Sequence, residues 1–198
     1  MKKIGFIVGV VLLSGSLTLS AASLASWSIA GVQNGFEGNP AWNCTTCAAG
    51  IDPVKTVLKL DETKFSKAYF PAKSFTYRHL NDTALNPERY IQVIVTPTSG
   101  KTMNLTELSF NIYSTANGPL QVAVRSSLDQ FGTSVKTADL TQGANTRVKV
   151  DMARLGLAGI KAPVEFRIYL WGATGVQTGY LTDDRSGPAV QLSGVILP

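Results

Sequence analysis

The sequence contains a single histidine, His79, among its 198 residues. Catalytic zinc sites commonly use several histidines, and a serine triad needs a histidine as its base. Zinc motifs with two histidines are therefore excluded. A triad would have to use His79, but no serine lies in a Gly-x-Ser-x-Gly motif, and glycine-rich phosphate loops are absent as well. We interpret His79 as a surface residue and predict that the protein is not an enzyme.

Charged residues are also scarce, at 16% of the chain, with 18 basic and 13 acidic residues and a formal net charge of +5. The bases are dispersed rather than gathered into a patch, which argues against a nucleic acid partner. A glycosidase needs two carboxylates held about 5 to 10 Å apart, and dispersed carboxylates give no sign of such a pair. A carboxylate hydrolase is the one enzymatic alternative that the composition leaves open.

No apolar run is long enough to cross a membrane as a helix. The chain begins Met1-Lys2-Lys3, and its apolar run from Ile4 to Leu13 falls short of the roughly 20 residues that a span needs. A basic start, a short apolar run and then small residues are typical of a secretory signal peptide. We predict that residues 1–25 are removed, with cleavage after Ala22 as the alternative.

Removal of the signal peptide would leave residues 26–198 as one domain with a net charge of +3, because Lys2 and Lys3 leave with it. A domain of this length buries roughly two thirds of the surface that its unfolded chain exposes. We expect the mature protein to be secreted, with the periplasm as the alternative location, and to have no membrane attachment.

Strands are indicated by a period of two in hydrophobicity over much of the chain. The clearest run places one set of residues on an apolar side and the other on a polar and aromatic side: Val164, Phe166, Ile168 and Leu170 against Glu165, Arg167, Tyr169 and Trp171. Further strands are expected at 27–29, 54–60, 74–77, 90–95, 107–113, 120–125, 148–150, 180–182 and 189–197.

These short strands, separated by turn residues, predict an all-β fold: a two-sheet jelly-roll β-sandwich. One short helical crossover is expected at 151–157, where an acidic residue begins the segment and a glycine lies near its end.

The two cysteines form the motif Cys44-Thr45-Thr46-Cys47. Export to an oxidising compartment favours a disulfide between them that pins a loop. An intermolecular bond, a metal site and redox catalysis stay open as alternatives. A redox pair is expected at the start of a helix in an α/β domain, which this sequence does not offer.

The polar side of the clearest strand is the candidate binding surface. It combines planar aromatic rings with the fork-shaped donors of arginine, and sugar rings stack on such aromatics. We predict five ligand-binding residues: Gln121, Arg125, Arg167, Tyr169 and Trp171. The alternative stays open that a loop covers the aromatic rings and that the arginines pair with Glu165 or Asp129.

Oxygen donors of the kind that calcium prefers occur at two places. Glu37 follows Asn34-Gly35-Phe36, and Asp183 and Asp184 precede the last strand. Calcium takes about six to eight oxygen ligands, and these three carboxylates supply only part of that number. We predict a structural calcium site at these residues, with a solvated turn and a capped loop as the alternative.

Segments 97–110, 124–131 and 163–169 resemble a domain common in exported bacterial proteins that carry PEP-CTERM sorting tails. The resemblance covers roughly residues 90–198 and implies a jelly-roll fold similar to that of carbohydrate-binding modules. The sequence has no sorting tail, which favours release over surface sorting.

A second resemblance concerns both ends of the domain. Asn34-Gly35-Phe36-Glu37 followed by Trp42, together with Asp183-Asp184, is similar to the start and finish of jelly-roll carbohydrate-binding modules. In those modules the equivalent acidic residues hold a structural calcium ion. The resemblance therefore implies Glu37 and Asp183 or Asp184 as ligands.

The sequence predicts a secreted, non-catalytic binding module that engages polysaccharide or another extracellular surface through one sheet face. A structural subunit of an extracellular matrix or filament is the alternative. In that case edge strands would self-associate with neighbouring chains.

Overall fold

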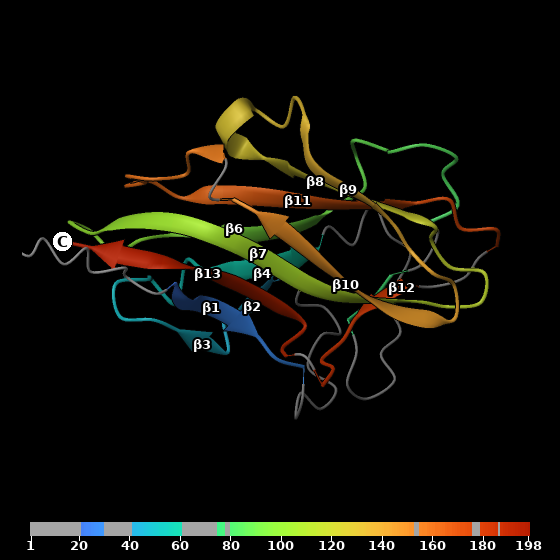
Figure 1. Cartoon of the computed structure of the whole chain (residues 1–198), viewed down its shortest axis with the longest axis horizontal. Helices are drawn as coiled ribbons and strands as arrows, with labels where there is room; N and C mark the ends of the chain where they lie inside the picture. Colours follow the sequence, from blue (N-terminus) through green and yellow to red (C-terminus); the bar gives the residue numbers. More distant parts are fainter. Residues whose placement is uncertain are drawn as a thin grey trace, which may run out of the picture.

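The computed structural model describes residues 21–29, 41–60, 75–77, 80–152, 155–175, 179–185 and 187–198. Within them the chain forms strands and one 3-10 helix, η1, with no α-helix (Figure 1). The elements are β1 (Ala22–Trp27), β2 (Ala41–Asn43), β3 (Thr46–Cys47), β4 (Val57–Leu60), β5 (Phe75–Tyr77), β6 (Ile91–Val95), β7 (Thr102–Ser114), β8 (Gln121–Ser126), η1 (Ser127–Asp129), β9 (Ser134–Asp139), β10 (Ala144–Asp151), β11 (Val164–Trp171), β12 (Gly179–Leu181) and β13 (Val190–Leu197). No helix in this part of the chain is long and apolar enough to cross a membrane.

The strands form two antiparallel sheets that pack face to face. One sheet has the order β3-β1-β13-β7-β12-β5, with β10 pairing with the opposite edge of β7, and the other has the order β2-β4-β6-β11-β8-β9. Strands β6, β7 and β8 alternate between the sheets, as do β9, β10 and β11. The four-strand sets β1-β13-β7-β10 and β6-β11-β8-β9 therefore face each other in a jelly roll, as the sequence predicts.

The core lies between the sheets and uses the side chains that the alternation assigns to it. Phe166 and Ile168 of β11 are fully buried in the same core cluster as Phe110 and Leu108 of β7, and Trp27 of β1 is the largest fully buried side chain among the described residues. Each buried aliphatic or aromatic side chain stabilises the fold by about 1.5 to 3 kcal/mol relative to an exposed one. This burial fixes which residues of β8 and β11 face outward.

In the crossover expected at 151–157, residues 153 and 154 lie outside the described residues, and Leu155, which follows them, has 3-10 conformation. One i to i+3 turn occurs there, in which the Leu155 N–H donates to the Met152 carbonyl at 3.0 Å, and β10 already extends to Asp151. The described 3-10 helix is η1, between β8 and β9. Asp151 itself completes an eight-residue strand paired with β7, so the crossover begins after it.

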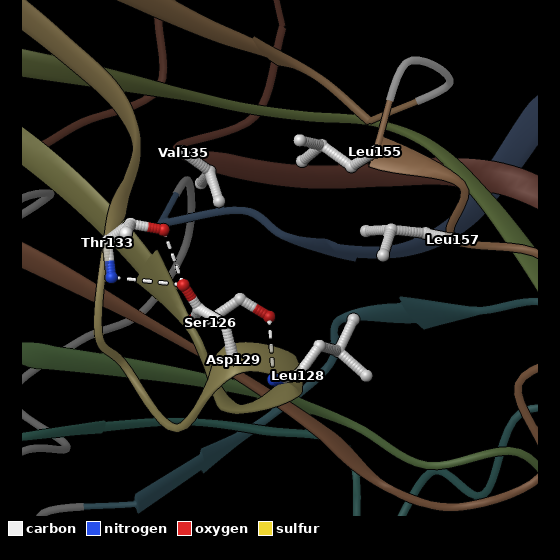
Figure 2. Close-up of a pocket in the computed structure, with 7 residues that line it drawn as sticks. All are labelled: Ser126, Leu128, Asp129, Thr133, Val135, Leu155 and Leu157. Carbon is white, nitrogen blue, oxygen red and sulfur yellow. Dashed lines mark hydrogen bonds between the residues drawn. The ribbon is translucent and has the colours of Figure 1, made fainter.

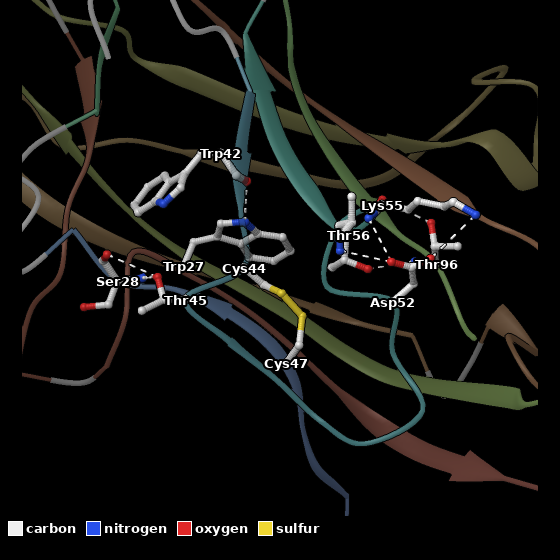
Figure 3. The surroundings of a disulfide bond; sticks show 11 residues. Trp27, Ser28, Trp42, Cys44, Thr45, Cys47, Asp52, Lys55, Thr56 and Thr96 are labelled. Atoms are coloured by element: carbon white, nitrogen blue, oxygen red, sulfur yellow. Dashed lines mark hydrogen bonds and ion pairs between the residues drawn. A yellow bond between two sulfur atoms is a disulfide. The ribbon is translucent and has the colours of Figure 1, made fainter. Parts of the chain in front are cut away.

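A disulfide closes the corner where the chain passes from one sheet to the other. Strand β2 pairs with β4, whereas β3 pairs with β1 of the other sheet. The Cys44 N–H donates to the Thr56 carbonyl at 3.1 Å, and the next residue, Thr45, donates to Ser26 at 2.8 Å. The Cys44–Cys47 bond spans this corner, with the two Cα atoms 5.9 Å apart (Figure 3). The predicted intramolecular disulfide is therefore present.

The corner is reinforced by the only hydrogen bond that the Trp27 indole can donate. Its Nε1–H donates to the Trp42 carbonyl at 3.0 Å, which ties β1 of one sheet to β2 of the other (Figure 3). Trp27 is fully buried, so an unpaired indole N–H there would cost stability. The disulfide and this bond therefore both link the two sheets at this corner.

A bulge beside Gly194 fits β13 between β1 and β7. The pairing skips Leu24 of β1 and Thr106 of β7 on either side of this position. A Cβ atom at Gly194 would collide with the Asn104 carbonyl oxygen and would lie 2.9 Å from Cδ1 of Leu24. Only glycine allows the Asn104 backbone and the Leu24 side chain to approach this closely.

We expect Gly194→Ala to lower the free energy of unfolding by at least about 3 kcal/mol, because a backbone carbonyl cannot move as a flexible side chain can. Ser193→Ala, at the neighbouring position of β13, should change it by less than about 0.5 kcal/mol. Urea denaturation monitored by tryptophan fluorescence measures both. Equal stability of the two variants would contradict the close packing at Gly194.

We expect removal of the disulfide by the double substitution Cys44→Ala and Cys47→Ala to cost about 2 kcal/mol, the loop-closure value for four residues. Thermal unfolding of the oxidised protein, with and without reductant, measures the loss. Reductant should lower the melting temperature of the wild type and leave the double variant unchanged. A reductant effect on the double variant would show that the loss has another origin.

Candidate binding face

The predicted ligand-binding residues lie together on the outer face of the six-stranded sheet. Strand β11 is flanked by β8 and β6, and the register places Arg167 between Arg125 and Gln92. Trp171 lies opposite Gln121. We call this surface the β11 face. The register therefore places all five predicted residues on the outward side of this sheet, as the alternation requires.

Tyr169 lies beneath this surface rather than on it. Its side chain is only 1% exposed. The Tyr90 ring packs against it edge to face with centroids 5.6 Å apart, and the guanidinium carbon of Arg125 lies 5.5 Å from its centroid. Burial raises the pKa of Tyr169, and the nearby arginines only partly oppose this. For Tyr169 the alternative of a covered ring therefore holds, because neighbouring side chains leave almost none of it exposed.

Arg167 is held in place by a carboxylate and two aromatic rings. Its Nε–H donates to Oε1 of Glu165 at 2.6 Å, and Gln92 donates to the same oxygen at 2.9 Å. The guanidinium carbon lies 3.6 Å from the ring centroid of Phe131 and 4.2 Å from that of Tyr90. Partial burial opposes the charge, but the hydrogen bond and charge of Glu165 raise the pKa of Arg167. The guanidinium is therefore charged and fixed.

The connection between β8 and β9 places the Phe131 ring against the Arg167 guanidinium. Gln130 and Phe131 have φ angles of 57° and 60°, which non-glycine residues seldom adopt. The Phe131 N–H donates to the Ser126 carbonyl at 2.8 Å, and its own carbonyl accepts from Nη1 of Arg125 at 3.1 Å. The backbone strain is thus offset by contacts with both arginines of the face.

Tyr90 and Phe131 are residues of this face that sequence reasoning missed. Tyr90 immediately precedes β6, and Phe131 lies in the tight loop after η1. Tyr90 begins the run expected as a strand at 90–95 but was not predicted to bind a ligand, and Phe131 lies outside the expected strands. Only the folded connection brings their rings to Arg167.

Trp171 and Gln121 form the other end of the face. Both side chains are half-buried, so part of the Trp171 indole remains accessible. Gln121 donates from Nε2 to Oδ1 of Asp139 at 2.6 Å, which fixes the orientation of its amide. This end of the β11 face therefore has an accessible ring and hydrogen-bonding groups. The end around Arg125 and Arg167 has its rings and donors largely engaged in contacts within the protein.

A separate pocket of about 300 Å³ opens where the β8–β9 connection meets residues 155–157 (Figure 2). It has aliphatic walls and a polar rim, formed by Leu128, Val135, Leu155 and Leu157 with Ser126, Asp129 and Thr133. Sequence reasoning missed it, because its two sides come from segments about 25 residues apart that meet only in the fold.

The pocket rim carries a negative charge. The Thr133 hydroxyl and backbone N–H both donate to Oδ2 of Asp129, and these bonds lower the pKa of the Asp129 carboxyl. A lowered pKa in the folded state means that this contribution to stability is present above the unfolded pKa and is lost as the pH falls through the folded value. The pocket therefore suits an aliphatic group of a ligand, which would lie beside the Asp129 carboxylate.

Of the three residues proposed for calcium, Asp183 and Asp184 lie in the described part of the chain, in the loop before β13. Oδ1 of Asp183 accepts from the Ala189 N–H at 2.7 Å, and Oδ2 accepts from the Ser28 hydroxyl at 2.6 Å. Asp184 follows in the same loop. No group of three or more His, Cys, Asp or Glu side chains in the described segments could hold a metal ion. Glu37 and His79 lie outside the described residues, so the calcium site stays a prediction.

No protein-family model matches this sequence, and no curated protein resembles it significantly. Among solved structures, the fold is similar to the K2 cleaved adhesin domain of Lys-gingipain, with a TM-score of 0.38 and 10% identity over 78% of this chain and 98% of that one. It is also similar to the Stig cyclase Fisc from Fischerella sp. TAU, with a TM-score of 0.35 and 12% identity over 89% of this chain and 98% of that one. Neither similarity bears on what this chain binds.

We expect Arg167→Lys to lower the free energy of unfolding by about 1 to 2 kcal/mol, because lysine keeps the charge beside Glu165 but loses the planar stacking on Phe131 and Tyr90. Arg185→Lys, at an exposed position, should be neutral within about 0.5 kcal/mol. Thermal and urea unfolding measure both. Full stability of Arg167→Lys would show that stacking contributes nothing at this site.

Proposed function

We propose that the protein is a secreted, non-catalytic binding module that engages polysaccharide through the β11 face. The observation that supports this proposal is the gathering of aromatic rings, two guanidinium groups and amide side chains on one sheet surface. Polysaccharides present apolar faces of sugar rings together with hydroxyl groups. A surface with rings and fixed polar groups side by side matches both features.

The groups available to a ligand differ along the face. At one end the Trp171 indole and the Gln121 amide are half-buried, so each keeps accessible atoms. At the other, Arg167 and Glu165 retain 24% and 21% of their side-chain exposure. We assign the stacking role to Trp171 and the hydrogen-bonding roles to Gln121, Arg125 and Arg167, with Tyr169 as a support beneath them.

Preorganisation also favours a binding role. Arg167 is fixed by Glu165 and by two rings, and Arg125 by the Phe131 carbonyl. Immobilising a flexible side chain on binding costs about 0.5 to 1.5 kcal/mol, and here the fold has already paid most of that cost. A ligand would therefore meet donors that are already in place.

The edge strands argue against the alternative of a filament subunit. Strand β9, at the edge of the six-stranded sheet, exposes Lys136 and Asp139, and β10 exposes Lys149. Charged side chains on edge strands oppose pairing with another sheet. Self-association through these edges is thus the less favoured proposal.

The proposed export is consistent with the same function. A disulfide such as Cys44–Cys47 persists in oxidising compartments, and a secreted module would meet polysaccharide there. The resemblance to exported bacterial jelly-roll domains, and through them to carbohydrate-binding modules, points the same way. Any structural calcium at Asp183 would support the fold rather than take part in ligand binding, since Asp183 lies on a loop before β13 of the other sheet.

The purified protein should be retained by at least one insoluble or arrayed polysaccharide, and Trp171→Ala should weaken that retention at least about tenfold, because loss of one stacking ring removes 1.4 kcal/mol or more. Tyr113→Ala is the matched control, since Tyr113 stacks on Tyr180 at 4.8 Å on the seven-stranded sheet. Glycan arrays and sedimentation with insoluble polysaccharides measure retention.

Absence of retention across the array would contradict the proposal. Retention that is lost in Tyr113→Ala and unaffected in Trp171→Ala would place binding on the other sheet. Circular dichroism of each variant would confirm that the sandwich is intact.

A further inference from the structure

We propose that the precursor is cut between Ala22 and Ser23, so that the mature protein keeps almost the whole of β1. The inference rests on the proposed export. It assigns a processing site that the sequence alone leaves divided between two positions.

Two consecutive patterns in the sequence satisfy the leader peptidase. Ser20-Ala21-Ala22 and Ser23-Leu24-Ala25 both have small residues at the last and third-last positions before the cut. The local pattern therefore does not distinguish a cut after Ala22 from a cut after Ala25. The sequence alone favours Ala25, but the positions of these residues in the fold favour Ala22.

The structure places the second pattern inside the sandwich. Leu24 and Ala25 are 2% and 0% exposed, and both belong to the core between the sheets. The Leu24 carbonyl accepts from the Ala48 N–H at 2.8 Å, just beyond the disulfide. Leu24 also lies against Gly194, at the bulge where β1, β13 and β7 meet. A cut after Ala25 would remove all of these contacts.

The same cut would weaken the corner between the sheets. Strand β3 is two residues long, and its partner in the seven-stranded sheet is β1, through Ala25 with Cys47 and Ser26 with Thr46. Loss of Ala25 removes one of these two pairs. It would also place a charged amino terminus on Ser26, a half-buried residue flanked by β3 and β13. Moving a charge out of water in this way is unfavourable.

A cut after Ala22 has none of these costs. Ala21, Ala22 and Ser23 are exposed, so the new amino group at Ser23 would lie in water. One register pair, Ala22 with Gly194, would be lost, while the pairs from Ser23 to Trp27 would remain. Once β1 is paired on both sides, the Ala25–Ser26 bond is also shielded from further cleavage.

The test uses the full precursor, expressed in a bacterium that has a general secretion pathway and recovered from the periplasm and medium. Intact mass and amino-terminal sequencing should identify a chain that begins at Ser23. Two matched variants distinguish the sites, because Ala22 and Ser23 are both exposed and tolerate a larger side chain. Ala22→Leu blocks the last position of the first pattern, and Ser23→Leu blocks the third-last position of the second.

We expect Ala22→Leu to abolish the product that begins at position 23, and Ser23→Leu to leave the cut after Ala22 unchanged. A mature chain that begins at Ser26, or loss of processing in Ser23→Leu, would overturn the inference while leaving export intact. Recovery of uncut precursor in the cytosol alone would overturn both export and the processing site.

Discussion

Burial of alternate side chains between the two sheets is the constraint on which the β11 face depends. Phe166 and Ile168 are fully buried, and successive residues of a strand point to opposite sides. Arg167 must therefore point outward. The antiparallel register then places Arg125 directly across from it, and like charges in that position repel. The structure resolves this conflict with a carboxylate, a backbone carbonyl and stacked rings. The composition of the face is thus a consequence of the core that it covers.

The features that the sequence predicts are those with a local periodic signal. Strands β6, β8 and β11 alternate in hydrophobicity, and the structure confirms their extent to within one residue and the side of the sheet that their residues face. Phe131 gave no such signal. Its position depends on two consecutive positive φ angles in the β8–β9 connection, which side-chain pattern alone does not encode. Tyr169 was assigned to the correct side, but its burial depends on Tyr90, a residue 79 positions away in the chain.

The contacts that stabilise the β11 face also limit what it offers a ligand. Arg167 already uses its Nε–H on Glu165 and its planar surface on two rings. Structural ion pairs of this kind are common on protein surfaces, and their presence alone does not indicate a site. The difference between the two ends of the face is the stronger argument for binding. At one end Arg167 has its partners within the protein, and at the other Trp171 and Gln121 are half-buried and keep accessible atoms. A rigid polar cluster next to an accessible ring is the arrangement that reduces the entropic cost of binding.

The disulfide matters more for where it lies than for the small loop that it closes. Strands β2 and β3 have three and two residues, too few to hold an edge by their own ladder bonds. They end the two sheets on the same side of the sandwich, and Cys44 and Cys47 join them across the corner. The Trp27 indole adds a second tie from β1 to β2. Because short, covalently fixed edge strands present few free backbone groups, the corner both closes the core and protects the sheets from pairing with other chains.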